Sequence, residues 1–365
     1  MNKTIPLTGY EMFSLQVLYV GASAGFLYPS LLINSTTGPL WAPIVVWALL
    51  AFSSCFLYGR MLLKLRGKEL VPIIISSLGK PAAIMLLLPI LLFVIAAITV
   101  MLRSFTELVT MTLLPTTPLL FLNGMIFASS ALAAAGLMPI IRAAKVIFLL
   151  GAGTIISLLI IGTSGSHWEL GGPWFQMSAD FFTDGDFYGG SFVWMGFTYI
   201  AMIAPFTIKQ AKLYQKGNMI ALVLSVLMVG CFIYIPVMTF GREMSSQLTF
   251  PFVSKMDSIY QYWIVLENLT AIFMSATMLC LLLVIALKLK ALMSIMTGIW
   301  PKVSINWGLA VVTVIIYIAA ELIPEWRDLE KWVFNSYFLR FYAMFVFPGI
   351  TLAGLHFKQR KAGGA

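Results

Sequence analysis

The chain has 365 residues, of which 60% are hydrophobic and only 10% are charged. Soluble domains are closer to half apolar and a quarter charged, so this composition excludes a water-soluble fold and predicts a protein embedded in lipid. The formal net charge of +9 would favour nucleic-acid binding in a soluble chain. No basic patch interleaved with aromatic residues occurs, so we expect no nucleic-acid partner.

Ten apolar stretches are long enough to cross a hydrocarbon core, which takes about 20 residues. In chain order they are 11–33, 40–63, 82–112, 118–136, 141–162, 190–207, 218–240, 260–287, 304–323 and 337–357. We therefore predict an all-α integral membrane protein with about ten transmembrane helices. The whole chain, 1–365, forms a single transporter-like domain in the lipid bilayer.

The connectors between these stretches alternate in charge, as the positive-inside rule requires. The basic set includes Lys64 and Arg142, and we also place Lys288 in it, just after the eighth stretch. The opposite set is acidic and includes Asp180 in the long loop 163–189. This alternation predicts that both termini are cytoplasmic. The aromatic content of the outer loop 163–189 favours a partly ordered lid.

The beginning of the chain allows a second interpretation. Lys3, the apolar run after it and the small residues 22–24 resemble a signal peptide with a cleavage site. However, Glu11 and Gln16 interrupt the apolar run, and apolar sequence continues through Phe26–Ile33. We therefore favour a first transmembrane helix.

The first and the sixth stretch are interrupted near their middles by small residues and proline. They occupy corresponding positions in two sets of five helices, which predicts inverted repeats of about 1–162 and 190–357. Broken helices expose backbone groups that can bind a carboxylate and an ammonium group. The predicted ligand-binding residues are Gly21, Ala22, Ser23 and Gly25 in the first helix and Phe197, Thr198 and Tyr199, flanked by Gly196 and Pro205, in the sixth. Close packing of helices through small residues is the alternative for the glycines.

Residues of the third and eighth helices complete the predicted pocket. Phe93 and Ala97 are one turn apart on the third helix and form an apolar wall. Thr277 on the eighth helix offers a hydroxyl to a ligand or cation, although such a hydroxyl often bonds its own backbone. No unpaired charge falls near the predicted midplane, so we predict a small, mainly apolar amino acid as the ligand.

Charged residues within the predicted spans are costly and therefore informative. Arg103 and Glu107 are four residues apart on one helix face, which predicts a structural or partner-contact pair. Glu267 is consistent with a pore or proton-linked role or with a simple interhelical hydrogen bond. Glu11 either caps the first helix or meets a basic loop. No metal cluster, nucleophile–base pair or nucleotide motif occurs, so we expect no enzyme, metal or cofactor.

Several short motifs resemble one known family: Tyr28–Pro29, Leu102–Glu107, Leu113–Pro118, Gly136 with Arg142, and Phe250–Pro251. Together they resemble the spore-germination permease family, the B subunits of bacterial germinant receptors, in the amino acid–polyamine–organocation transporter superfamily. The resemblance implies a LeuT-like 5+5 inverted repeat with helices 1 and 6 broken. It also implies A and C subunits as partners and a location in the inner membrane of a bacterial spore, with both termini on the core side.

Three functions fit this interpretation of the sequence. The first is a germinant-receptor B subunit that binds a small amino acid in the membrane and signals spore germination. The second is an amino-acid permease, a secondary transporter that turns over its substrate. A structural or channel-forming scaffold is a third. The resemblance favours the sensing role.

Overall fold

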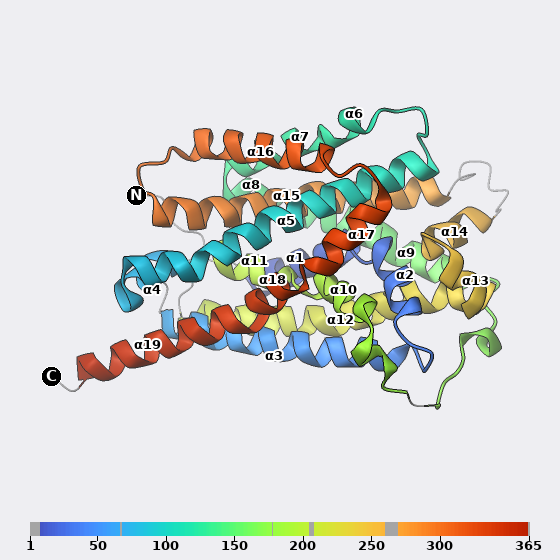
Figure 1. Ribbon diagram of the computed structural model, residues 1–365, viewed down its shortest axis with the longest axis horizontal. Coiled ribbons are helices and arrows are strands. Elements are labelled where there is room, and N and C mark those ends of the chain that lie inside the picture. Colours follow the sequence, from blue (N-terminus) through green and yellow to red (C-terminus); the bar gives the residue numbers. More distant parts are fainter. Residues whose placement is uncertain (1–7, 66–67, 177, 204–207, 260–268, 364–365) are drawn as a thin grey trace.

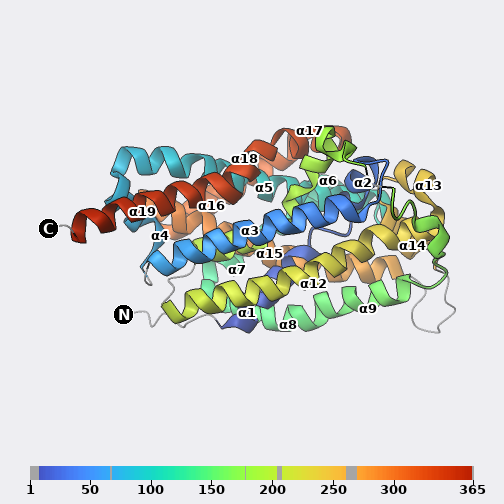
Figure 2. The ribbon, with the colours of Figure 1, turned by 90° about the horizontal axis from the view of Figure 1, so that it is seen from below.

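The chain forms a bundle of helices whose long axes run in broadly the same direction (Figures 1 and 2). The computed structural model describes residues 8–65, 68–176, 178–203, 208–259 and 269–363, and no strand occurs among them. Six helical segments in this part are long and apolar enough to span a membrane: Trp41–Leu65, Lys80–Thr112, Leu137–Gly162, Lys212–Phe240, Leu269–Ile299 and Tyr337–His356. Two shorter apolar helices are Leu119–Ala135 and Ile305–Glu321.

In terms of individual elements, the unbroken spans are α3 (Trp41–Leu65), α5 (Lys80–Thr112), α12 (Ile208–Phe240), α15 (Leu269–Ile299) and α16 (Ile305–Glu321). Others are divided into successive pieces: α6 (Leu119–Asn123) with α7 (Met125–Ala135), α8 (Leu137–Ile147) with η1 (Phe148–Ala152) and α9 (Gly153–Gly162), and α18 (Tyr337–Phe341) with η5 (Tyr342–Val346) and α19 (Phe347–Gly363). The segments η1 and η5 are π-helical and fall in the fifth and tenth spans, which correspond in a 5+5 arrangement.

The first and sixth spans are broken, as the sequence predicts. The first consists of α1 (Gly9–Gly21) and α2 (Leu27–Asn34), and the sixth of η4 (Gly190–Trp194) and α11 (Gly196–Ile203). Both α1 and α11 lie inside the bundle and pack against each other and against α15. With these two, the described part of the chain accounts for the ten predicted spans and confirms the fold class.

Shorter elements cover the two ends of the bundle. At one end, α4 (Leu70–Leu78) stops at Gly79, whose φ of +81° favours glycine, and α5 begins directly after it with Lys80 and Pro81. The opposite end carries η2 (Trp168–Gly171), η3 (Asp180–Thr183), α10 (Gly185–Gly189), α13 (Arg242–Gln247), α14 (Pro251–Ser258) and α17 (Trp326–Asn335). We refer to this opposite end as the acidic end; in Figure 1 it lies opposite the end of α19.

The long loop that precedes the sixth span is held in place by specific contacts. Asp180 accepts hydrogen bonds from the hydroxyl of Thr36 at 2.6 Å and from the backbone N–H of Thr37 at 2.7 Å. Burial would raise the pKa of Asp180, but these hydrogen bonds outweigh it and hold the pKa well below its usual range. Trp168 stacks on Trp174 with ring centroids 4.0 Å apart. The described part of the loop is therefore held by these contacts, and its action as a lid stays a prediction.

The eighth span ends further along the chain than the sequence analysis places it. It was expected over 260–287, whereas α15 runs from Leu269 to Ile299. Glu267 and Pro205 lie outside the described residues. The apolar run continues beyond Lys288 to Ile299, and the helix with it, so Lys288 does not belong to a loop. It is buried in the bundle, with 2% of its surface exposed.

Two charged pairs hold helices as the sequence predicts. Arg103 forms an ion pair with Glu107 at 2.9 Å and also donates hydrogen bonds to the carbonyls of Ile323 and Pro324. Glu11 caps α1 together with Thr8 and forms an ion pair with Lys145 at 2.8 Å. The expected contact between Arg103 and Glu107 is confirmed, and its other partners belong to this same chain.

Candidate functional site

A small cavity lies where the broken helices meet α5, α15 and the start of the last span. Its volume is about 40 Å³, counted as the space open to the centre of a water-sized sphere. The residues that carry its chemistry are Tyr19 of α1, Ser23 of the first break, Phe93 and Ala97 of α5, Tyr199 of α11, Lys288 of α15 and Arg340 of α18. Four of the predicted ligand residues, Ser23, Phe93, Ala97 and Tyr199, therefore share one cavity.

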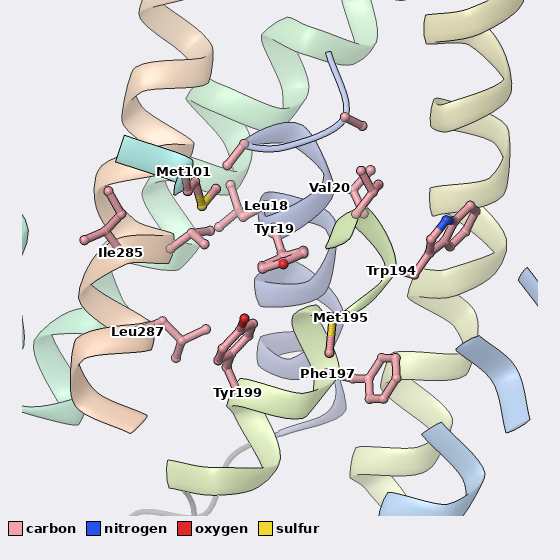
Figure 3. Packing of buried hydrophobic residues seen from close by; sticks show 14 of the residues in the cluster. Leu18, Tyr19, Val20, Met101, Trp194, Met195, Phe197, Tyr199, Ile285 and Leu287 are labelled. Atoms are coloured by element: carbon pink, nitrogen blue, oxygen red, sulfur yellow. The ribbon is translucent and has the colours of Figure 1, made fainter. Parts of the chain in front are cut away.

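The broken helices approach each other closely at this point. A Cβ atom on Gly196 would lie 2.8 Å from Cβ of Tyr19 and 2.4 Å from the side-chain oxygen of Gln16, so only glycine fits the start of α11. The rings of Tyr19 and Tyr199 lie 5.8 Å apart, and Phe93 stacks on Tyr199 at the same centroid distance. Figure 3 shows the hydroxyls of Tyr19 and Tyr199 turned toward each other. Aromatic rings thus form one wall of the cavity.

Lys288 places a cation against this aromatic wall. Its ammonium nitrogen lies 5.2 Å from the centroid of the Tyr19 ring and 5.1 Å from that of Tyr199, within the range of a cation–π interaction. It donates a hydrogen bond to the carbonyl of Ala97 at 3.3 Å and contacts the sulfur of Met101. An ammonium group has three donors, and the carbonyl is the only oxygen that it bonds within the described residues.

Arg340 brings a second buried cation to the same cavity, with 4% of its surface exposed. It donates hydrogen bonds to the hydroxyl of Ser336 and to the carbonyls of Val333 and Tyr188. These acceptors hold the guanidinium in place, while its Nε has no hydrogen-bond partner in the described part of the chain. No ion pair of Lys288 or Arg340 with a carboxylate occurs there either.

The other predicted ligand residues do not line the cavity. The break of the sixth span falls at Met195, so Phe197 and Thr198 lie inside α11 and not at a break. Phe197 points away from Tyr199 and packs against Tyr58 (Figure 3). The hydroxyl of Thr198 donates a hydrogen bond to the carbonyl of Met195, three residues earlier, as Ser and Thr hydroxyls in helices often do.

The remaining residues are buried near the cavity but outside it. Gly21 ends α1, Ala22 follows it, and Gly25 packs against Phe273, where close contact favours the small-residue interpretation. Thr277 lies three turns before Lys288 on α15, roughly 16 Å along the helix axis. A part for these residues in ligand binding stays a prediction.

The premise that the predicted pocket holds no unpaired charge is wrong, because both Lys288 and Arg340 line the cavity. Hydropathy alone treats a lysine as the boundary of a span, although the apolar run resumes at Ala291 and continues to Ile299. That continuation was the signal for a buried lysine. Arg340 lies inside the last predicted span, where a charged residue is itself the signal for a functional position.

A larger and more polar depression lies between the cavity and the acidic end. We call it the vestibule; its volume is about 320 Å³ on the same measure. Asp186, Arg327 and Glu330 line it, and Val333 lines both the vestibule and the cavity. Partial burial, together with the charges of Asp184 and Glu330, raises the pKa of Asp186 to about 6. The vestibule therefore lies next to the cavity, at the acidic end.

Comparison with family models identifies the chain. Residues 7–325 match the model of a family described as spore germination protein, which is most of the sequence and all of the cavity except Val333, Ser336 and Arg340. The chain belongs to this family. It is the family of the B subunits of germinant receptors, which confirms the resemblance seen in the sequence motifs. No curated protein matches the chain.

Solved structures with a similar fold are transporters. A Na⁺-coupled sialic acid symporter in a substrate-bound outward-open state has 14% identity and a TM-score of 0.61, over 90% of this chain and 75% of that chain. A nucleobase-cation-symport-1 family transporter with bromovinylhydantoin bound has 16% identity and a TM-score of 0.61, over 96% and 80%. A manganese transporter of Eremococcus coleocola has 12% identity and a TM-score of 0.63, over 91% and 76%. Because the sequence identities are low, the similarity of these structures shows the fold alone, which is the LeuT fold.

Proposed function

We propose that the chain is the B subunit of a germinant receptor, which binds a small carboxylate-bearing ligand in the cavity and signals spore germination through A and C subunits. The observation that carries the proposal is the position of the cavity, where Tyr19 of α1 and Tyr199 of α11 enclose Lys288 of α15. A ligand there would contact both broken helices at once. Its binding would bias how they pack, and the partners would respond to that change. The proposed location is the inner membrane of a spore, with both termini on the core side.

The walls of the cavity support a small ligand. Ala97 and Ser23 leave space that larger side chains would fill, and Phe93 and the tyrosine rings offer apolar contact. A volume of about 40 Å³ corresponds to roughly three water positions. The size and the apolar wall fit the small amino acid expected from the sequence, and the buried cations add a place for its carboxylate.

The substitution Ala97→Phe tests this proposal, because the new ring would occupy the ligand's volume. A panel of the twenty amino acids and small carboxylates first identifies the germinant to which spores no longer respond when the gene is deleted. Germination is measured as loss of refractility. Spores that carry Ala97→Phe should not germinate with that germinant. The amount of the protein in the inner membrane should stay unchanged. Leu92→Phe is the matched control, since Leu92 lies on the same helix, is 53% exposed and does not line the cavity. An unchanged response of the Ala97→Phe spores would place the ligand elsewhere.

A permease that turns over its substrate is the second candidate, and the shared fold with known transporters favours it. Uptake of the cognate germinant into proteoliposomes that contain the purified chain separates the two. The receptor role predicts binding without net accumulation. Accumulation that Ala97→Phe abolishes would favour the permease.

A further inference from the structure

The cavity contains two buried cations. Lys288 and Arg340 both line it, and no carboxylate is present among its described lining residues. Neither cation forms an ion pair in the described part of the chain, although the same bundle pairs the buried Arg103 with Glu107. The buried Lys255 likewise has no ion pair among the described residues and bonds the carbonyl of Ser164, so the cavity differs in bringing two such cations together.

Burial of an unpaired ion is costly, and partial solvation by the protein offsets only part of that cost. Arg340 bonds two carbonyls and one hydroxyl, whereas Lys288 bonds a single carbonyl and is otherwise flanked by two tyrosine rings and a sulfur. Lys288 is the less satisfied of the two. A ligand with a negative group would complete its donors and compensate its charge.

We propose that the ligand of this cavity is a small organic anion with a net charge of −1 at neutral pH, whose carboxylate accepts a hydrogen bond from Lys288. This inference rests on the proposed function and narrows the ligand that it names. A zwitterion would bring its own ammonium group into a cavity that holds two cations and no described carboxylate. An amino acid meets the requirement only when it has a second carboxylate.

The size of the cavity limits the anion to a few heavy atoms beyond its carboxylate. L-Lactate and L-alanine make a matched pair of probes, because they share a skeleton and differ by a hydroxyl in place of the ammonium group. Shape and apolar contact with Phe93 and Ala97 are therefore equal for the two. A difference in their affinities reports the charge preference of the site.

The experiment is equilibrium binding of L-lactate and L-alanine to the purified full-length chain in detergent, by isothermal titration calorimetry at pH 7.5. L-Lactate should bind at least tenfold more tightly than L-alanine. Lys288→Met, which is slightly shorter and has no charge, should weaken L-lactate by at least tenfold and reduce its preference over L-alanine to less than threefold. Lys288→Arg should retain most of the L-lactate affinity. Ala97→Phe should abolish binding of either probe.

The outcomes separate this inference from the proposed function. If L-alanine binds at least as tightly as L-lactate and Ala97→Phe abolishes its binding, the site exists but is not selective for anions, and only the inference fails. If L-lactate, formate, acetate and pyruvate all fail to bind the wild-type chain, the inference is overturned as well. If probes bind but Ala97→Phe has no effect, both proposals fail. Should Lys288→Met not fold, the preference of the wild-type chain between the two probes decides alone.

Discussion

The cavity and the vestibule lie next to each other and share Val333, but they differ in which charged residues line them and in what surrounds those charges. The vestibule has a volume of about 320 Å³ and combines Asp186 and Glu330 with Arg327 among polar neighbours. The cavity has a volume of about 40 Å³ and sets Lys288 and Arg340 among aromatic and apolar side chains. Charges that keep contact with water cost little and select weakly, whereas desolvated charges interact strongly with whatever enters.

This difference indicates that the two regions contribute differently to ligand binding. The vestibule is larger and is lined by acidic, basic and neutral polar side chains. The cavity is small, closed by the two tyrosines, and contains the unpaired cations. Specificity for the ligand should therefore depend on the cavity, and changes in the vestibule should alter stability or access by much smaller amounts.

The largest effect should follow from forcing apart the two helices that form the cavity. We expect Gly196→Val to abolish ligand binding and to destabilise the protein by about 3 kcal/mol, because its Cβ would overlap Tyr19 and branched atoms cannot be accommodated. The midpoint of thermal unfolding in detergent measures the stability. Gly230→Ala on α12 is the control, since no atom lies within 4 Å of the added Cβ, and it should be neutral or stabilising. A stable Gly196→Val protein that still binds would show that the helices need not approach this closely.

A smaller effect should follow from breaking the buried ion pair between Arg103 and Glu107. Arg103→Ala would leave Glu107 without its partner and the carbonyls of Ile323 and Pro324 without donors, at a cost of about 2–3 kcal/mol. From the sequence alone, exchanging the two charges should restore what either single change loses. The structure alters that expectation.

In the exchanged protein Arg103→Glu with Glu107→Arg, the new carboxylate would face the two carbonyls. We therefore expect the double variant to recover only part of the stability that the single variants lose, as measured by a double-mutant cycle of unfolding midpoints. Ligand affinity should change by less than threefold throughout, because neither residue lines the cavity. Full recovery would mean that the two carbonyl contacts contribute nothing.

The smallest effect should come from the vestibule itself. The pKa of Asp186 is raised to about 6, so its neutral form is favoured by folding, and this contribution to stability is complete below about pH 4 and is lost as the pH rises through 6. Asp186→Asn should therefore raise the stability at pH 7.5 by about 1 kcal/mol, discounted for partial exposure, and change it little at pH 4. Unfolding midpoints between pH 4 and 8 test this. Asp328→Asn should have almost no effect at any of these values, because its ion pair with Lys331 is exposed.

Much of the architecture could be predicted from local sequence. Spans require about 20 apolar residues in succession, and lipid leaves a backbone few options other than a helix, so composition determines the number of helices and their class. The matched interruptions near Gly21 and Gly196 located the broken helices, and the spacing of Arg103 and Glu107 predicted their ion pair. The boundaries of the inverted repeats, about 1–162 and 190–357, stay a prediction.

The content of the cavity was decided by tertiary structure. Ser23, Phe93, Ala97 and Tyr199 meet there as expected, but sequence placed Lys288 in a basic loop and left Arg340 unnoticed. Mean hydropathy is averaged over residues that are adjacent in sequence, and a lysine lowers it enough to mark the end of a span. Packing of α1, α5 and α11 around α15 surrounds the same lysine with tyrosine rings and one carbonyl. Whether a charge lies in water or in a binding cavity depends on residues far apart in sequence, and only the folded chain brings them together.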